Sequence, residues 1–232
     1  MFVRLRRKMT TFNLILNPLT LVLDFESGIP PSLQHFQNSS IKGCNFHFTQ
    51  AVWRKVQSLG LVAHYKTGIP RKIIKSLMTL PFIPRMWIRQ TFTAITTMDN
   101  GQLPAVTELL EYFSNTWLNG QYPIVMWNVY RQDTRTNNKL EGWHNSMNRA
   151  VKKSHSNIFE LITTLKMEQS VTDRTRTSGG RSARLGTQPP PMRPKTKERQ
   201  KNISALQDEL ASGRRSIEDY LAAMRRHVGV KC

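Results

Sequence analysis

The stretch Leu19-Thr20-Leu21-Val22-Leu23-Asp24 indicates an α/β fold, because it is a short apolar run that ends at a carboxylate. It follows Asn17-Pro18, which favours a turn, so we predict a buried strand over residues 19–23. Ligands of open α/β sheets bind beyond the carboxyl ends of the strands, which makes Asp24 a candidate site residue. An aspartate here can equally cap the next turn through the backbone, and position alone favours that interpretation.

The residues that follow predict a second strand and two helices. Ser27-Gly28 and Pro30-Pro31 indicate a short helix through residue 36, and the apolar residues of 40–48 indicate the second strand. Thr49 is expected to cap a helix that Gly60 ends. The apolar face of this helix is Val52, Val56 and Leu59. We therefore expect two strands at most in a chain dominated by helices.

Residues 66–131 have helical periodicity throughout. Pro70, Pro84 and Pro104 stand where prolines begin helices, and an apolar stripe typical of a buried helix face follows each. The stripes are Ile73, Ile74 and Leu77; Trp87, Ile88, Phe92 and Ile95; and Val106, Leu109, Leu110, Phe113 and Trp117. Residues 122–130 fit a helix or a strand. After a loop over 131–137, we predict helices over 138–153 and 157–171.

The chain changes character at Thr172. Residues 172–196 are polar, basic and rich in Gly and Pro, which predicts a disordered linker because they bury too little apolar surface to offset ordering entropy. Residues 197–232 are a predicted helical tail, with helices over 197–210 and 216–228. Ser216 and Asp219 have the spacing of a capping box. We expect the tail to contribute little to the stability of the front region.

The charge favours a polyanionic partner. Among 232 residues, 34 Lys and Arg face 15 Asp and Glu, a net charge of +19. Such an excess favours nucleic acid and argues against an ordinary metabolic enzyme; a basic surface with no specific site is the alternative. The 39% of hydrophobic and 21% of charged residues exclude wholesale disorder.

Two cysteines, Cys44 and Cys232, are too few for a disulfide framework and indicate an intracellular protein. The apolar run of residues 12–23 is interrupted by Asn17 and Pro18 and lacks a cleavage site. A membrane span needs about 20 apolar residues. We therefore expect no signal peptide and no membrane partner.

Glu141 is a second candidate carboxylate, in the helix predicted over 138–153. It borders the apolar stripe of that helix, with His144 beside it on the polar flank, where a carboxylate facing a metal ion could stand. Asn138 and Glu141 also have the spacing of a capping box, and spacing alone favours that structural interpretation.

Cys44 and His47 form a Cys-x2-His pair. A structural zinc ion takes about four ligands, and only His35 and His64 lie near in the sequence, so zinc is not expected. A buried thiol and one functional imidazole beside Asp24 are the more natural interpretation. The sequence has no glycine-rich phosphate loop and no recognisable Ser-His-Asp arrangement.

Several motifs follow one another in a specific order along residues 14–170. They are Asp24-Phe25-Glu26, then Gly43-Cys44-Asn45-Phe46-His47-Phe48 with Gln50, Arg54 and Gly60-Leu61, then Leu80-Pro81-Phe82-Ile83-Pro84 and Trp127-Asn128. The most specific is Arg135-Thr136-Asn137-Asn138, followed by Glu141-Gly142-Trp143-His144. With these motifs the chain resembles the Mutator-like element (MULE) transposases.

The resemblance implies an α/β chain built on a partial RNase H-like transposase core in residues 1–65. A large all-helical insertion would occupy 66–135, which agrees with the helical periodicity of 66–131. Residues 136–171 would hold the catalytic-type helix and the helix after it. The linker over 172–196 and the tail over 197–232 lie beyond the resemblance.

The resemblance also implies roles for particular residues. In this family two aspartates and a glutamate bind two divalent ions, Mg²⁺ or Mn²⁺, for DNA cleavage and strand transfer. Asp24 matches the second aspartate and Glu141 matches the glutamate, so both would be catalytic metal ligands. The residues implied to support the site are Cys44, His47, Asn137, Asn138 and His144.

The chain departs from the family at its start, because no aspartate precedes Asp24 to match the first catalytic one. Two divalent ions about 4 Å apart repel each other strongly, so losing the carboxylate between them leaves such a centre incomplete. We therefore expect a truncated MULE-type DDE transposase that is catalytically incomplete as given.

DNA is the expected partner, with a second copy of the chain or another transposase chain as a further one. The basic runs at residues 4–8 and 193–201, together with a DNA substrate, point to the nucleus. The alternative is a non-catalytic nuclear DNA-binding or interaction protein that uses the same basic surface.

Overall fold

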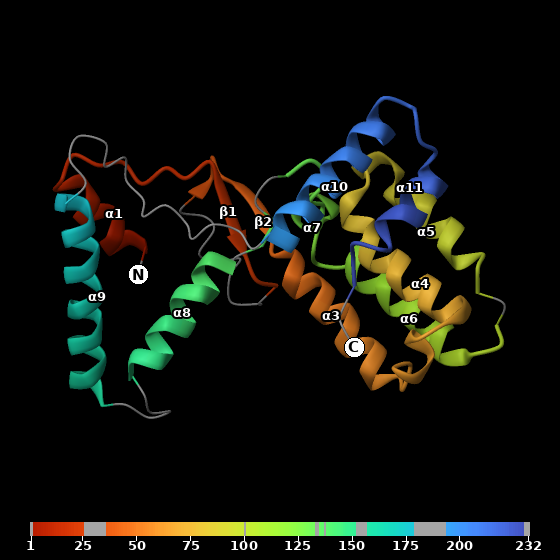
Figure 1. Ribbon diagram of the computed structural model, residues 1–232, viewed down its shortest axis with the longest axis horizontal. Helices are drawn as coiled ribbons and strands as arrows, with labels where there is room; N and C mark the ends of the chain where they lie inside the picture. The colour runs from red at the N-terminus through yellow and green to blue at the C-terminus, as the bar shows by residue number, and fades with distance from the viewer. Residues whose placement is uncertain are drawn as a thin grey trace. The chain divides into compact units, whose positions relative to one another are not determined.

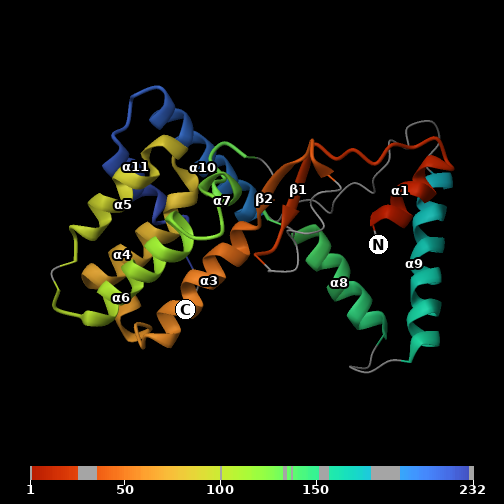
Figure 2. The same cartoon turned by 180° about the vertical axis from the view of Figure 1, so that it is seen from behind.

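The structure is a computed structural model that describes residues 2–25, 36–99, 101–132, 135–136, 138–151, 157–178 and 194–229. The chain divides into two compact units, here called unit 1 (Met1–Thr136 with Glu198–Cys232) and unit 2 (Asn137–Lys197). Helices dominate both, and unit 1 also holds a small sheet (Figures 1 and 2). The short helix expected from residue 27 falls almost wholly outside the described residues.

Two short parallel strands form the sheet of unit 1. β1 (Thr20–Leu23) pairs with β2 (Ser40–Gly43), and Leu23 lies opposite Gly43. The pairing continues one step further, because the backbone amide of Cys44 donates to the Leu23 carbonyl over 2.7 Å. The prediction of a mostly helical chain with two strands is confirmed.

The second strand is shorter than predicted, and the prediction of a strand over 44–48 is wrong. α3 (Asn45–Ser58) begins directly after Cys44, which is its N-cap. The buried residues of α3 recur every fourth position: Phe48, Val52 and Val56. The alternation of apolar residues that suggested a longer strand is therefore the start of a helical stripe.

Thr49 was expected to cap this helix and lies inside it instead. Its hydroxyl donates to the Asn45 carbonyl over 2.9 Å, a bond back along the helix. The helix ends as predicted: Leu59 is its C-cap, and Gly60 follows with a φ of +68°, which glycine adopts without steric cost.

The middle of unit 1 is helical, as predicted. Its elements are η2 (Ala63–Tyr65), α4 (Gly68–Thr79), η3 (Leu80–Phe82), η4 (Arg85–Trp87), α5 (Ile88–Thr96), α6 (Pro104–Phe113), η5 (Ser114–Leu118) and α7 (Ile124–Trp127). All residues of the first and third predicted stripes are buried, whereas Trp87 and Phe92 of the second are partly exposed. The ambiguous residues 122–130 contain the short helix α7.

Aromatic rings and one buried amide fix the centre of unit 1. The rings of Phe48 and Trp127 stack with centroids 5.3 Å apart. The buried side-chain amide of Asn128 donates to the carbonyls of Pro81 and Ile83 over 3.0 and 2.8 Å. Hydrogen bonds therefore join two of the motifs, Trp127-Asn128 and residues 80–84.

The C-terminal helices belong to the core of unit 1, so the expectation of an independent tail is wrong. They are α10 (Pro194–Ala211) and α11 (Ile217–Met224), and the capping box is confirmed because Ser216 Oγ accepts from the Asp219 amide over 3.1 Å. Their residues in the core cluster are Ile203, Leu210, Tyr220, Leu221, Met224 and Val228. A polar stretch of sequence separates α10 and α11 from the rest of unit 1. Each of the two helices still has an apolar face that must pack against a partner, and the core supplies it.

Unit 2 contains α8 (Asn138–Val151) and α9 (Ile158–Ser178). Because α9 runs on to Ser178 and α10 starts at Pro194, the linker prediction is wrong over 172–178 and 194–196. The helix α9 therefore ends just before Gly179, the first glycine of the predicted linker. Residues 179–193 of the predicted linker lie outside the described residues.

The remaining helix of unit 1 is α1 (Phe2–Thr10), which precedes the sheet in the sequence. In the described part of the chain, no helix combines the length and apolarity of a membrane span.

Candidate functional site

Three of the candidate residues meet where the two strands end. Asp24 follows β1 directly, Cys44 follows β2 directly, and His47 lies in the first turn of α3. Asp24 Oδ1 and His47 Nδ1 are 2.8 Å apart, and one ligand atom from each of the three residues lies within 4.8 Å of the other two. The parallel register brings Asp24 beside Cys44, and one helical turn adds His47.

Exposure separates the thiol from the other two side chains. Cys44 is completely buried, whereas the side chains of Asp24 and His47 are 33% and 27% exposed. A thiol without access to solvent is not available as a nucleophile, so its place here is in packing, as expected. The Asp24–His47 pair can reach a ligand, and the carboxylate can orient the imidazole.

Aromatic residues hold the backbone beside Asp24. The ring of Phe25 meets the rings of Trp117 and Tyr122 edge-on, with centroids 4.9 and 5.1 Å apart, and the Tyr122 hydroxyl donates to the Phe25 carbonyl over 2.8 Å. A Cβ atom on Gly43 would collide with the same ring. Sequence reasoning missed Tyr122 as a support of the site. It lies 97 residues from Phe25 in the sequence, and no local pattern around either residue indicates the contact.

The first residue of the motif that begins at Arg135 contacts the N-terminus of α3. The Asn45 amide donates to the Arg135 carbonyl over 2.8 Å. The Arg135 guanidinium lies over the Phe82 ring, 5.3 Å from its centroid, and bonds to Gln200. The backbone of residues 135–136 therefore lies next to the first turn that carries His47.

The other candidates belong to unit 2 or lie outside the described residues. Glu141 and Asn138 are placed in α8, but only their backbone is described. His144 is exposed on the same helix, with its ring 5.4 Å from that of Trp143, and Asn137 is outside the described residues. Their roles in a site with Asp24 stay predictions.

A cationic side chain lies on β2 near this edge. Lys42 donates to the Val125 carbonyl over 2.9 Å. Burial, and then the positive charge of Arg85, lower the pKa of Lys42 below its usual range. Lys42 and Arg85 line a groove with Val125, Asn128 and Tyr130.

The described donors do not fit a centre of two magnesium or manganese ions. Such ions prefer oxygen ligands, and the cluster supplies one carboxylate, one thiol and one imidazole. Nor does the pair have the spacing of zinc ligands: bond lengths near 2.1 Å in a tetrahedron separate two ligands by about 3.4 Å. The 2.8 Å between Asp24 and His47 is a hydrogen-bond distance instead.

Comparison with known protein families, with curated proteins and with solved structures gives no match for this chain.

Proposed function

We propose that this chain is a MULE-type DDE transposase fragment, with a partial RNase H-like core, that binds DNA and lacks a complete cleavage centre. Transposition and DNA recombination would be its ancestral process and the nucleus its location. Support comes from the motifs and from their arrangement in space. The sequence draws attention to Asp24 by its place after a strand and to Cys44 and His47 by their spacing, and the fold gathers all three at one sheet edge.

The observation that carries the proposal is the 2.8 Å contact between Asp24 and His47 at the carboxyl ends of two parallel strands. Such an edge is where open α/β sheets bind ligands. Stability alone explains the contact poorly, because a contact as exposed as this one contributes at most about 1 kcal/mol even between two charged groups. An accessible acid beside an imidazole fits a ligand site better than a structural clamp.

The proposal assigns no catalytic step to the chain. The intact family site would take Mg²⁺ or Mn²⁺ on Asp24 and Glu141, but the described donors do not fit that centre. DNA binding needs no metal, because 34 basic residues against 15 acidic ones attract phosphates directly.

A second chain is part of the proposal. Within the described residues, β1 pairs only with β2, so its other edge presents unpaired backbone groups. Open edges of this kind pair readily with another strand. A second copy of the chain, or another transposase chain, could supply it.

The alternative function is a non-catalytic nuclear DNA-binding or interaction protein derived from a transposase. The same charge supports it, and so does the mismatch between the described donors and a two-ion centre.

Sequencing the genomic locus and the 5′ end of the transcript separates the two functions. Terminal inverted repeats and an upstream in-frame strand with an aspartate would support the transposase. An isolated, expressed reading frame would favour the alternative. Absence of any DNA binding by the purified chain would contradict both.

A further inference from the structure

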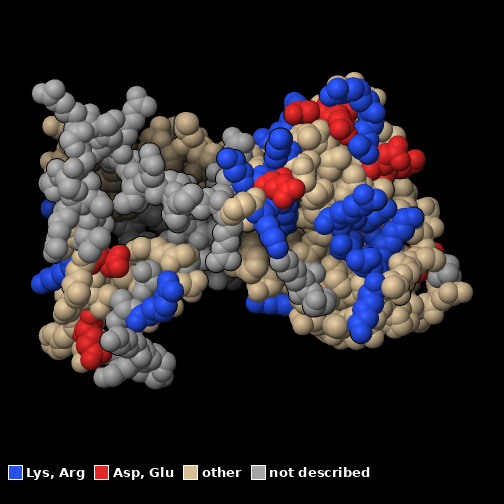
Figure 3. Space-filling model, viewed as in Figure 1, with Lys and Arg blue, Asp and Glu red and all other residues tan. Residues whose placement is uncertain are grey.

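Basic side chains from three helices gather on one face of unit 1. Arg71 and Lys75 are one turn apart on α4, so they share a side of that helix. Arg225 follows α11, and its Nη1 donates to Ser76 Oγ over 3.0 Å, which places the end of α11 beside α4. Figure 3 shows Lys and Arg gathered over α4 and α11.

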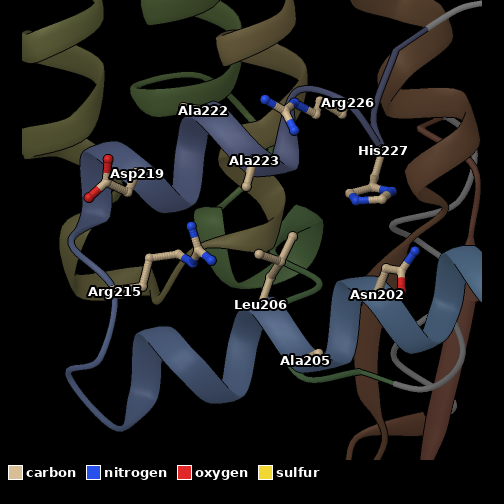
Figure 4. Close-up of a pocket in the computed structure, with 9 residues that line it drawn as sticks. All are labelled: Asn202, Ala205, Leu206, Arg215, Asp219, Ala222, Ala223, Arg226 and His227. Atoms are coloured by element: carbon tan, nitrogen blue, oxygen red, sulfur yellow. The ribbon is translucent and has the colours of Figure 1, made fainter.

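This surface continues onto α10. Arg226 and His227 follow Arg225, and with Arg215 and Asn202 they line a groove between α10 and α11 (Figure 4). The positive charge of Arg199, from the start of α10, acts on His227 as well. We call the whole set the basic face; its members are Arg71, Lys75, Arg199, Arg225, Arg226 and His227.

One carboxylate, that of Asp219, lies beside the basic face, because it lines the same groove. In unit 1, Lys55, Arg131 and Arg215 each pair with a carboxylate at 2.6–2.8 Å. Within the part of the chain that the structure describes, none of the five Arg and Lys residues of the basic face has such a partner. Three cations elsewhere on unit 1 are therefore paired with acids, whereas the basic face gathers five that have no such pair among the described residues.

The titration behaviour agrees with this crowding. Burial, then the charges of Arg71 and Arg225, lower the pKa of Lys75. Burial, then the charges of Arg199 and Arg226, lower the pKa of His227. Neighbouring like charges repel each other and raise the free energy of the free protein, and a bound anion would relieve that cost.

Helix stability does not explain the basic face. The C-terminus of a helix carries about half a negative charge, which accounts for roughly one of the cations after α11. Arg71 lies near the N-terminus of α4, where the helix dipole disfavours a cation, and the first turn of α4 has no acidic residue. The arrangement is unfavourable for the free protein.

We propose that the basic face binds the phosphodiester backbone of duplex DNA. This rests on the proposed function, which makes DNA the ligand, and it adds where the DNA lies. A row of phosphates suits cations spread over three helices better than a single small anion does. If each of the five Arg and Lys contacts one phosphate, the basic face supplies a slope of about −4.5 in log K against log salt.

The test is fluorescence anisotropy with the full chain and a labelled 30-base-pair duplex, between about 50 and 200 mM salt. The variant Arg71→Gln/Lys75→Gln/Arg226→Gln removes three charges from the basic face. Its slope should be shallower by about 2.7, because each lost phosphate contact removes about 0.9. The double variant Arg71→Gln/Arg226→Gln changes only exposed side chains and should lose about 1.8, so the test survives if the triple variant misfolds.

A charge-matched control decides whether the place of the charges matters. Arg54, Arg149 and Lys166 are exposed and lie on α3, α8 and α9, outside the basic face. The variant Arg54→Gln/Arg149→Gln/Lys166→Gln has the same net charge as the triple variant and should keep the parent's slope.

Equal slopes for the two triple variants would overturn the proposal, since binding would then depend on net charge alone. The proposal also fails if the basic-face variant binds DNA normally but loses binding to vesicles that contain phosphatidylserine. In both results the parent binds DNA, so DNA binding stands and only its location is wrong. A parent that binds no DNA would contradict the proposed function as well.

Discussion

The hydroxyl of Tyr220 donates to the Phe82 carbonyl over 2.6 Å, a bond that joins α11 to the turn after α4. Tyr220 and Met224 are completely buried, and Leu221 is 5% exposed. α11 is therefore a structural part of unit 1, although it is remote in sequence from the helices that it contacts.

Tyr220→Phe removes this bond and little volume. We expect it to lower the free energy of unfolding by about 1 kcal/mol, because the buried Phe82 carbonyl loses its donor. Urea unfolding measures the change. Tyr122→Phe is a matched control on a partly exposed hydroxyl, and a loss in Tyr122→Phe as large as in Tyr220→Phe would show that burial of the bond does not matter.

The stability of the parent relative to Tyr220→Phe should also depend on alkaline pH. Burial raises the pKa of Tyr220 above its usual value of 10. The folded state therefore holds the phenolic proton more tightly than the unfolded state, and the stabilisation is complete below about pH 10 and declines as the pH rises above it. The stability difference between parent and Tyr220→Phe should shrink above pH 10. A constant difference would contradict the raised pKa.

Deleting residues 198–232 should strongly destabilise unit 1. The deletion uncovers core side chains that pack on Ile203, Leu210, Tyr220 and their neighbours, and loss of even one large buried side chain costs about 2–5 kcal/mol. Thermal unfolding measures the effect. A melting temperature equal to that of the full chain would restore the independent tail that the sequence suggested.

The sequence predicts the local parts of this fold well. A strand forms within the predicted range 19–23, Gly60 ends a helix and Ser216 caps one, because each depends on a few neighbouring residues. The second strand is too long in the prediction because Phe46 and Phe48 alternate in a way that fits a strand as well as the first turn of a helix. Hydrophobic periodicity is ambiguous over so short a run.

Contacts between distant segments are the part that the sequence does not reveal. The bonds of Asn128 to Pro81 and of Tyr122 to Phe25 depend on how the helices pack, which no single segment encodes. The meeting of Asp24 and Cys44 is an exception, because parallel strands of equal length end at the same edge. Where Glu141 lies relative to them depends on the arrangement of two units, and motif spacing does not set it.

Gly43→Ala should destabilise unit 1 by about 1–3 kcal/mol, because the new methyl group would overlap the Phe25 ring in a packed site. Phe25→Leu frees that space at its own cost. We expect Gly43→Ala to cost much less in the Phe25→Leu background than in the parent. Additive losses in urea unfolding would mean that the two residues do not compete for space.

The chain should not nick supercoiled DNA with Mg²⁺ or Mn²⁺. Among the described residues, Asp24 supplies the one carboxylate of its cluster, and its Oδ1 lies 2.8 Å from His47 Nδ1. Parent, Asp24→Asn and Glu141→Gln should therefore be equally inactive. Circular dichroism checks that both variants are folded. We expect them to be, since losing a contact as exposed as that of Asp24 costs at most about 1 kcal/mol. Nicking by the parent that disappears in both variants would contradict the prediction, because a further acidic residue would then have to complete the metal-binding centre.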